Sequence, residues 1–467
     1  MQTSLIGIRF NRPAVLKQTA AVLVMALCAG SAYASNTVFD QPDPDFKGRV
    51  FSPGVVTPGG NAVINGSGFK AGQEIQLLRS GQNVAKDQVL TAGQDGKFST
   101  SIAIPADAAI GRHPIVVQVA KPSAAEVFEL KVSPDIKFSG ADKFTIVSER
   151  LRPGMYQSAY SAASNMLYVT SSAGRPPATE SVLMKVDPDT LKIEASATAA
   201  TSMVNGKNRV MAIFGVAVDD AAGTVWVTNT RDNTVAVYKQ SDLSLVKQFE
   251  PGAAPHARDV AIDSAHHRAY VSAFGAGEIA VFDTQKLEPL DAIAIKSGIR
   301  GEEFKPMGLS LDARNSKLYT VSLPSNQAAM IDLAKQQVEQ VYALPGAEGS
   351  IGVAVAPEAN VLFVASQGSD NIQILDLEKG EVLHSVSVGA SPLSVVWDAK
   401  DKLAYVISRG AGSIAVINLD GKLLANLKAG SLPNHLSTDG KGHIFSINKA
   451  RGKDDETRDQ VTKITLK

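Results

Sequence analysis

Short apolar runs alternate with turn-forming residues over most of the chain, and none of them keeps a helical period. Between Ser350 and Gly389, four runs rich in Val, Ile and Leu are separated by Pro-Glu-Ala-Asn, Gly-Ser-Asp and Glu-Lys-Gly. β-Branched residues suit a pleated, half-buried surface, whereas Gly, Pro, Asn and Asp suit tight turns. The pattern therefore predicts four consecutive β-strands, at residues 352–355, 361–365, 371–375 and 381–388.

The two middle runs of this segment recur so that seven copies can be counted, each with an aromatic residue at the same place. These aromatic residues are Tyr168, Trp226, Tyr270, Tyr319, Phe363, Tyr405 and Phe445, and their spacings are 58, 44, 49, 44, 42 and 40 residues. A period of about 40 to 45 residues with four strands per repeat is typical of β-propeller blades, which bury their two apolar faces only between neighbours. The sequence thus predicts a seven-bladed β-propeller.

The region before the repeats has a different pattern. Runs such as EIQLLR and HPIVVQV alternate polar and apolar residues, and turns are expected at Pro58 and Asp95-Gly96. This spacing suits a small β-sandwich, and the glycines from Gly66 to Gly72 resemble those of bacterial immunoglobulin-like (Ig-like) modules. The expected fold class is all-β: an Ig-like β-sandwich at residues 49–134, followed by the seven-bladed propeller at residues 135–467.

The last repeat lacks one strand, because the chain ends at the third strand of that repeat, VTKITLK. An additional strand is expected at residues 143–151, between the sandwich and the first complete repeat. We expect Phe144–Arg150 to pair with Val461–Leu466 as the outer strand of the last blade. Such a closing strand fastens the first and last blades by a hydrogen-bonded ladder, and ring closure leaves no unburied end blade.

The N-terminal residues predict export. Arg9, Arg12 and Lys17 precede an apolar stretch too short to span a bilayer, and Ala32-Tyr33-Ala34 has the small residues of a cleavage site. Residues 1–34 are therefore a predicted signal peptide, cleaved near Ala34, and the mature protein is expected to be periplasmic or secreted, with no membrane span. Residues 35–48, polar with two prolines, are expected to be a flexible linker.

Cysteine content and charge exclude several classes of function. The one cysteine, Cys28, lies in the predicted signal peptide, so the mature protein has no thiol for a disulfide, a nucleophile or covalent haem. Removing the three leader cations leaves 43 Lys and Arg against 46 Asp and Glu, a net charge of −3. The overall charge therefore predicts neither nucleic-acid nor membrane binding, and no cofactor is expected.

The motif Tyr168-Val-Thr, repeated as Trp226-Val-Thr-Asn and Tyr270-Val-Ser, resembles the YVTN family of bacterial β-propellers. The resemblance covers roughly Lys143 to Lys467 and rests on packing motifs, so it is specific for the fold. It implies periplasmic residence, a non-enzymatic role and, as one option, affinity for single-stranded DNA. Such binding requires basic grooves with exposed aromatic residues, and the predicted loops carry few of these, chiefly Tyr156, Phe274 and Phe304.

In a propeller, the loops between second and third strands and those between blades open on one face, around the mouth of the central channel. Cations gather in these loops and at the starts of the innermost strands, where side chains converge on the axis. Converging cations suit a phosphate or a carboxylate, although the anions in the same loops are also compatible with an ordinary solvated surface. The predicted ligand-binding residues are Arg209, His256, Arg258, Lys305, Arg409, Asn434 and His435.

Other chemistries find less support in the sequence. At best His256 and His435 lie near each other, too few ligands for a metal site, and no Ser/His/Asp arrangement or carboxylate pair is recognisable. The sequence therefore predicts an exported, non-enzymatic binding or scaffold protein for an anionic small molecule, a nucleic acid or a protein partner. A propeller hydrolase of the lactonase type, with His256 or His435 as base, is the alternative.

Overall fold

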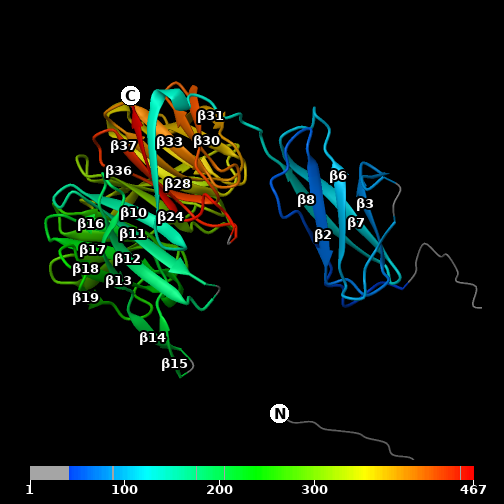
Figure 1. The fold of residues 1–467 in the computed structure, drawn as a ribbon, viewed down its shortest axis with the longest axis horizontal. Helices are drawn as coiled ribbons and strands as arrows, with labels where there is room; N and C mark the ends of the chain where they lie inside the picture. Colours follow the sequence, from blue (N-terminus) through cyan, green and yellow to red (C-terminus); the bar gives the residue numbers. More distant parts are fainter. Residues whose placement is uncertain (1–40, 87–88, 175, 205, 453) are drawn as a thin grey trace, which may run out of the picture.

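The computed structural model describes residues 41–467 except 87–88, 175, 205 and 453 (Figure 1). In these ranges the regular structure consists of strands and three single-turn 3-10 helices, η1 (Ala141–Lys143), η2 (Thr230–Asp232) and η3 (Pro357–Ala359). The all-β class predicted from the sequence is confirmed. No helix among the described residues has the length and apolar character needed to cross a membrane. The predicted signal peptide lies outside the described residues.

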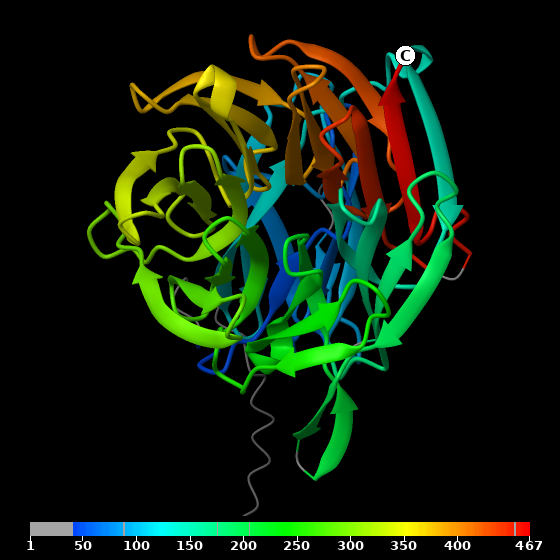
Figure 2. The ribbon, with the colours of Figure 1, turned by 90° about the vertical axis from the view of Figure 1, so that its left-hand side faces the viewer.

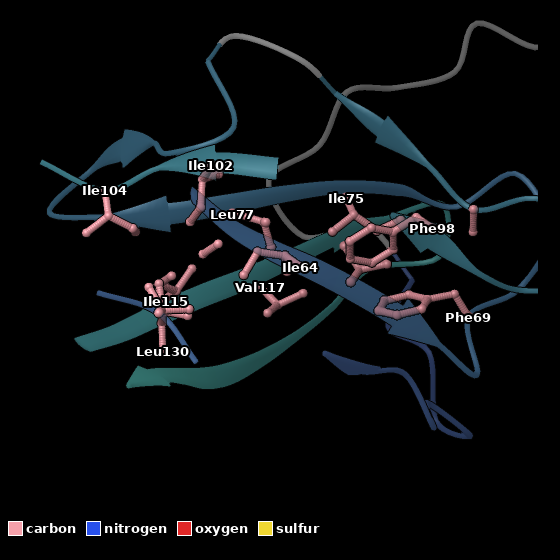
Figure 3. Packing of buried hydrophobic residues seen from close by; sticks show 14 of the residues in the cluster. Ile64, Phe69, Ile75, Leu77, Phe98, Ile102, Ile104, Ile115, Val117 and Leu130 are labelled. Carbon is pink, nitrogen blue, oxygen red and sulfur yellow. The ribbon is translucent and has the colours of Figure 1, made fainter. Parts of the chain in front are cut away.

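The N-terminal unit consists of two antiparallel sheets that share one core. The first contains β1 (Arg49–Phe51), β2 (Asn61–Ser67) and β6 (Phe98–Ala103); the second contains β3 (Glu74–Arg79), β4 (Gln82–Asn83), β5 (Leu90–Thr91), β7 (Gly111–Ala120) and β8 (Ala124–Val132). Alternate residues of β2 point inward, and Ile64 meets Ile75, Leu77 and Val117 of the second sheet in the core (Figure 3). We call this unit the sandwich.

The described part of the expected linker, residues 41–48, is not a free tether but packs on the sandwich. The backbone N–H of Asp43 donates to the carbonyl of Ser123 at 2.7 Å, and the Asp43 carboxylate accepts a hydrogen bond from Lys70 at 2.6 Å. Phe46 lies edge-on against Phe69, with ring centroids 5.7 Å apart. The paired Asp43 carboxylate and the packed Phe46 ring fix this segment on the sandwich. Because these contacts are long-range, they leave no local pattern in the sequence.

From Phe144 onwards, the described residues form seven four-stranded antiparallel sheets in chain order. The first four are β10 (Met155–Ser161), β11 (Met166–Ala173), β12 (Glu180–Val186), β13 (Ile193–Thr198); β16 (Ile213–Asp219), β17 (Thr224–Asn229), β18 (Thr234–Lys239), β19 (Leu245–Gln248); β20 (Ala257–Asp263), β21 (Arg268–Ala273), β22 (Glu278–Asp283), β23 (Glu288–Ala294); and β24 (Pro306–Asp312), β25 (Lys317–Ser322), β26 (Gln327–Asp332), β27 (Gln337–Ala343). A two-stranded hairpin, β14 (Thr201–Val204) and β15 (Lys207–Val210), stands between the first two sheets.

The remaining three sheets complete the set. They are β28 (Ser350–Ala356), β29 (Val361–Ser366), β30 (Asn371–Asp376), β31 (Glu381–Ser387); β32 (Pro392–Asp398), β33 (Leu403–Ser408), β34 (Ser413–Ile417), β35 (Leu423–Lys428); and β36 (Pro433–Thr438), β37 (His443–Asn448), β38 (Gln460–Leu466), β9 (Phe144–Arg150). Strand β9 pairs antiparallel with β38, with Phe144 opposite Leu466 and Glu149 opposite Val461. The strand before the first sheet therefore becomes the outer strand of the last one.

The sheets form a closed ring around a central axis (Figure 2). The first strand of each sheet contacts the first strand of the next, in the order β10, β16, β20, β24, β28, β32 and β36, and β36 contacts β10. The recurring aromatic residues pack in the layers between sheets: Phe363 of β29 stacks on Trp397 of β32, with centroids 5.4 Å apart. Their full burial explains the regular aromatic spacing in the sequence.

The sandwich docks on one face of the ring through ion pairs. Arg112 of β7 donates from Nε to Glu348 at 2.6 Å, and Lys131 of β8 donates to the buried Asp370 at 2.6 Å. Glu348 precedes β28 and Asp370 lies between β29 and β30, so both belong to the face that carries the loops between second and third strands. In Figure 2 the sandwich, in blue, lies behind the ring on that face.

Candidate ligand-binding site at the channel mouth

Each of the seven first strands has a register irregularity near its start. In β10 it falls between Met155 and Ser158, and in β20 between Ala257 and Val260. Such a β-bulge bends a strand and redirects a side chain. At least one residue from each bulge lines a cavity on the ring axis, and the residues at the equivalent position, one after the start of each strand, are Tyr156, Phe214, Arg258, Met307, Ile351, Leu393 and Asn434.

The Thr or Ser of the Tyr-Val-Thr motif supports the bulge in three of these strands. The backbone N–H of Gln157 donates to the hydroxyl of Thr170 at 3.2 Å, that of Gly215 to Thr228 at 2.7 Å and that of Asp259 to Ser272 at 2.9 Å. A bulge leaves an N–H without its ladder partner, and the hydroxyl supplies one. The motif that identifies the repeat therefore also shapes the channel mouth.

The cavity has a volume of about 490 Å³. We call its end on the face that carries the sandwich the channel mouth. There the rings of Tyr156 and Phe214 stack, with centroids 3.7 Å apart. The Lys449 ammonium lies 3.0 Å from the centre of the Tyr156 ring, and the Arg231 guanidinium lies 5.5 Å from that of Phe214. The aromatic pair is thus held between two cations, which the electron-rich ring faces attract.

Two arginines complete the charge at the mouth. Arg258 and Arg409 both line the cavity, and burial lowers the pKa of each. Arg409 donates to the side-chain oxygen of Asn434 at 3.2 Å, and the Asn434 amide donates to the carbonyl of Tyr156 at 2.6 Å. We call Arg231, Arg258, Arg409 and Lys449 the mouth cations. Within the described residues, none of the four forms an ion pair with a carboxylate.

The Lys449 amine responds most strongly to this arrangement. Burial, together with repulsion by Arg409, Arg258 and Arg231, lowers its pKa to about 6. The acid next to Arg258, Asp259, forms no ion pair with it but binds backbone amides: its two oxygens accept hydrogen bonds from Val260 at 3.0 Å and Leu309 at 2.9 Å, and its charge offsets that of Arg258 in part. Burial raises the pKa of Asp259, because a carboxylate away from water is less stable in its charged form.

His435 lines the cavity as a neutral ring. The backbone N–H of Ser158 donates to Nδ1 of His435 at 3.3 Å, and burial lowers the pKa of His435 to about 4. A neutral imidazole that accepts at Nδ1 has its proton on Nε2. His435 therefore offers a hydrogen-bond donor. Among the described residues, no three His, Cys, Asp or Glu side chains gather as a metal site would require.

Of the seven residues predicted from the sequence, Arg258, Arg409, Asn434 and His435 come together in the cavity lining. The other three do not line it. Arg209 lies on the hairpin strand β15, because the innermost strand begins only at Ile213. His256 is exposed in the turn before β20, beside Phe274.

Lys305 is the third predicted residue outside the cavity. It forms an ion pair with Glu303 at 2.9 Å and lines a separate surface pocket with Arg300. The expectation that Arg209, Arg258 and Lys305 converge is therefore wrong. The connections between sheets differ in length, so residues just before an innermost strand do not occupy equivalent positions in the ring.

The sequence analysis did not assign Tyr156, Phe214, Arg231 or Lys449 to the site. Tyr156 and Phe214 occupy the same bulge position as Arg258, one residue after the start of the first strand. An alignment of the repeats on that position would have placed both rings at the mouth. The sequence analysis instead counted Tyr156 among the loop aromatic residues, and aromatic residues in strands, such as Phe214, are usually read as core residues.

Comparison with known proteins supports the ring as a β-propeller. No protein-family model matches the chain. It is 25% identical over 331 residues to "Uncharacterized protein YncE" of Salmonella typhi, covering 67% of this chain and 88% of the relative, and 25% identical over 332 residues to YncE of Escherichia coli K12.

Solved structures with a similar fold include virginiamycin B lyase from Staphylococcus aureus. Its TM-score is 0.54 at 13% identity, and the match covers 69% of this chain and all of the lyase. Hydrazine synthase of Kuenenia stuttgartiensis has a TM-score of 0.54 at 16% identity, covering 63% of this chain and 93% of the synthase chain. At these identities the likeness concerns the fold alone. The chain is thus similar in sequence to YncE proteins and in fold to propeller proteins.

Proposed function

We propose that this protein is an exported, non-enzymatic binding protein whose channel mouth holds an anionic small molecule. In this proposal the ring is a seven-bladed propeller, the sandwich is an Ig-like module, and cleavage near Ala34 releases the protein to the periplasm or the exterior. One observation carries the proposal: within the described residues, the mouth cations have no carboxylate ion pair.

Arg258, Arg409 and Lys449 are partly buried and Arg231 is exposed, and positive charges on these residues repel one another in the free protein. This repulsion contributes to the low pKa of Lys449. An anion placed among them removes the repulsion and gains charge-assisted hydrogen bonds of about 1.5–3 kcal/mol each. Arg258 and Arg409 line the cavity from two different sheets, as expected of residues that grip a ligand between them.

The dimensions favour a small molecule over a polymer. A cavity of about 490 Å³ lies within the range of small-ligand sites. Single-stranded DNA is bound in long grooves with several exposed aromatic residues, whereas Tyr156 and Phe214 stack on each other and Phe304 is buried. The sandwich also stands over this face of the ring. These features favour a small anion. Binding of a nucleic acid or of a protein partner instead is an alternative outcome of the binding experiment.

Isothermal titration calorimetry tests the proposal. The parent protein is titrated with inorganic phosphate, with short carboxylates and with an oligothymidine, and compared with Arg258→Ala/Arg409→Ala. We expect the double variant to lose about 100-fold in affinity for a small anion, since two charge-assisted contacts are removed. The matched control is Arg209→Ala, which removes an arginine outside the cavity. Equal affinity in the parent and the double variant, or binding of the oligothymidine alone, would contradict the proposal.

The hydrolase alternative makes a separate claim about His435. A hydrolytic base needs a free basic nitrogen, whereas Nδ1 of His435 already accepts a backbone hydrogen bond. The lyases of similar fold support no particular chemistry here. Assaying lactone hydrolysis by the parent and by His435→Ala tests this point: turnover by the parent that disappears in the variant would favour the hydrolase.

A further inference from the structure

The seven bulge residues occupy one structural position but fall into two arcs of the ring. Met307, Ile351 and Leu393, from the neighbouring strands β24, β28 and β32, are aliphatic. The opposite arc, from β36, β10, β16 and β20, presents Asn434, Tyr156, Phe214 and Arg258. Arg409 and Lys449 contact residues of this second arc. Because the strands follow one another around the axis, the aliphatic arc faces the cationic arc across the channel.

The aliphatic character continues along the channel below the mouth. The same three strands line the cavity with Leu309, Leu311, Val353, Val355 and Val395. The charged residues of the lining are Arg258, Asp259 and Arg409. Arg258 and Asp259 lie at the bulge of β20, and Arg409 lies in the loop after β33, so all three belong to the mouth end. A ligand in this cavity thus meets charge at one end and, along the side formed by these three strands, mainly aliphatic residues interrupted by Ser310 and Ser394.

We infer that the ligand is an amphiphilic acid, with a carboxylate or phosphate head at the mouth cations and an apolar body against the wall of β24, β28 and β32. This inference rests on the proposed function and adds the chemical class of the ligand. A simple inorganic anion would use the arginines but not the aliphatic arc, where Leu393 is half-buried and Met307 and Ile351 are largely covered, whereas contact of an apolar body with this arc is favourable. A medium-chain fatty acid is the simplest molecule of this class and serves as the probe.

The first experiment varies the ligand. The full-length mature protein is titrated by calorimetry, at one salt concentration, with acetate, hexanoate, octanoate and decanoate. Each buried methylene is expected to raise the affinity about threefold to fourfold. Octyl phosphate and inorganic phosphate form a second pair, which distinguishes a phosphate head from a carboxylate head. Decanamide is the matched neutral control and should bind at least tenfold more weakly than decanoate.

The second experiment varies the protein. Leu393 is half-buried at the mouth, so Leu393→Asn puts a polar side chain into the aliphatic arc. This variant should flatten the dependence of affinity on chain length. Arg258→Ala should do the reverse, with weaker binding of every acid and an unchanged chain-length dependence. If Leu393→Asn does not fold, the chain-length series on the parent still decides the question.

The outcomes separate this inference from the proposed function. Equal affinities for acetate and decanoate, both lowered by Arg258→Ala, would overturn the amphiphilic class and leave anion binding in place. Equal affinities for decanoate and decanamide, insensitive to Arg258→Ala, would overturn both. If neither any acid nor phosphate binds the parent, the proposed function itself is wrong. Affinity that rises with chain length and falls on loss of the acidic head supports both.

Discussion

On the face of the ring opposite the mouth, aspartates occupy the turns between third and fourth strands, and each is bound within its own turn. Asp187 accepts backbone N–H bonds from Asp189 and Thr190 at 2.9 and 2.7 Å, and Asp283 accepts them from Gln285 and Lys286 at 2.9 Å. These hydrogen bonds lower the pKa of both carboxyls. At the mouth, by contrast, the mouth cations have no acid partner within the described residues.

The same repeat therefore produces two kinds of charged surface. Where an aspartate closes a turn, its charge stabilises the fold, because folding supplies the hydrogen bonds that the carboxylate needs. Where arginines and a lysine gather without a carboxylate ion pair among the described residues, the fold gains little from their charge. The charge is then available to a ligand. Substitutions on the two faces should accordingly separate stability from binding.

The largest expected effect on stability is that of Asp220→Ala, on the face opposite the mouth. The Asp220 carboxylate accepts hydrogen bonds from Gln240 and from the backbone N–H groups of Ala162 and Ala163, at 2.9, 2.9 and 3.1 Å. It thereby ties two neighbouring sheets together. Chemical denaturation should show a loss of about 2–3 kcal/mol in the free energy of unfolding. The affinity for anions should not change, and a loss of affinity with unchanged stability would contradict the comparison.

The next effect concerns pH and Lys449. In the free protein this amine is neutral above about pH 6, while a bound anion favours the charged form and raises its pKa. Binding should therefore take up a proton, and affinity should fall as pH rises above 6, by up to tenfold per unit. Besides burial, Arg409, Arg258 and Arg231 lower the pKa of Lys449 and Asp459 raises it by a smaller amount, while burial keeps His435 neutral.

Calorimetry in buffers of different ionisation enthalpy measures this proton uptake directly. Lys449→Met is the matched control, since it keeps an apolar stem beside the Tyr156 ring but cannot titrate. The variant should bind anions with little dependence on pH between 6 and 8. If the anion affinity of the parent protein is instead constant over this pH range, the charge of Lys449 does not contribute to binding.

A smaller effect is expected from Arg258→Ala on the free protein. Removing one of the mouth cations should leave the free energy of unfolding within about 0.5 kcal/mol of the parent, or raise it. Thermal denaturation without added anions, at low salt, is the measurement. A loss comparable to that of Asp220→Ala would mean that Arg258 is a structural residue, and the contrast between the two faces would fail.

The smallest effect should come from Lys305→Ala. Lys305 has an acid partner, Glu303, at 2.9 Å and lies outside the cavity. Its loss should change the affinity for a small anion by less than about twofold, since a screened charge at this distance contributes little. Titration at physiological ionic strength tests this. A large loss would show that the site extends beyond the mouth cations.

Much of the fold could be predicted from the sequence, because its signals are local and repeated. The aromatic residues recur because each is buried between two sheets, and the pairing of β9 with β38 followed from a last repeat that was one strand short. Residues 41–48 could not be placed, because their contacts with Ser123 and Lys70 are long-range and leave no pattern.

The site was only partly predictable. Arg258, Arg409, Asn434 and His435 were found because loops on one face of a ring must converge. Tyr156 and Phe214 were missed, because their position depends on a bulge that turns them from the sheet towards the axis. The bulges themselves depend on hydroxyls such as Thr170 and Thr228 from the second strand. The Tyr-Val-Thr motif thus shapes the channel mouth through these hydroxyls, but their contact with the bulge is visible only in the three-dimensional structure.

The ladder between β9 and β38 also has a consequence for the order of folding. It joins Phe144 to Leu466, so the ring closes only with the C-terminal strand of this chain in place. Contacts of such sequence separation form late and slowly, since the loop they close is long. Until then the last sheet has an exposed edge, the kind of surface that pairs with other chains. Refolding yield should therefore fall as protein concentration rises, whereas in the finished ring β9 covers the edge of β38.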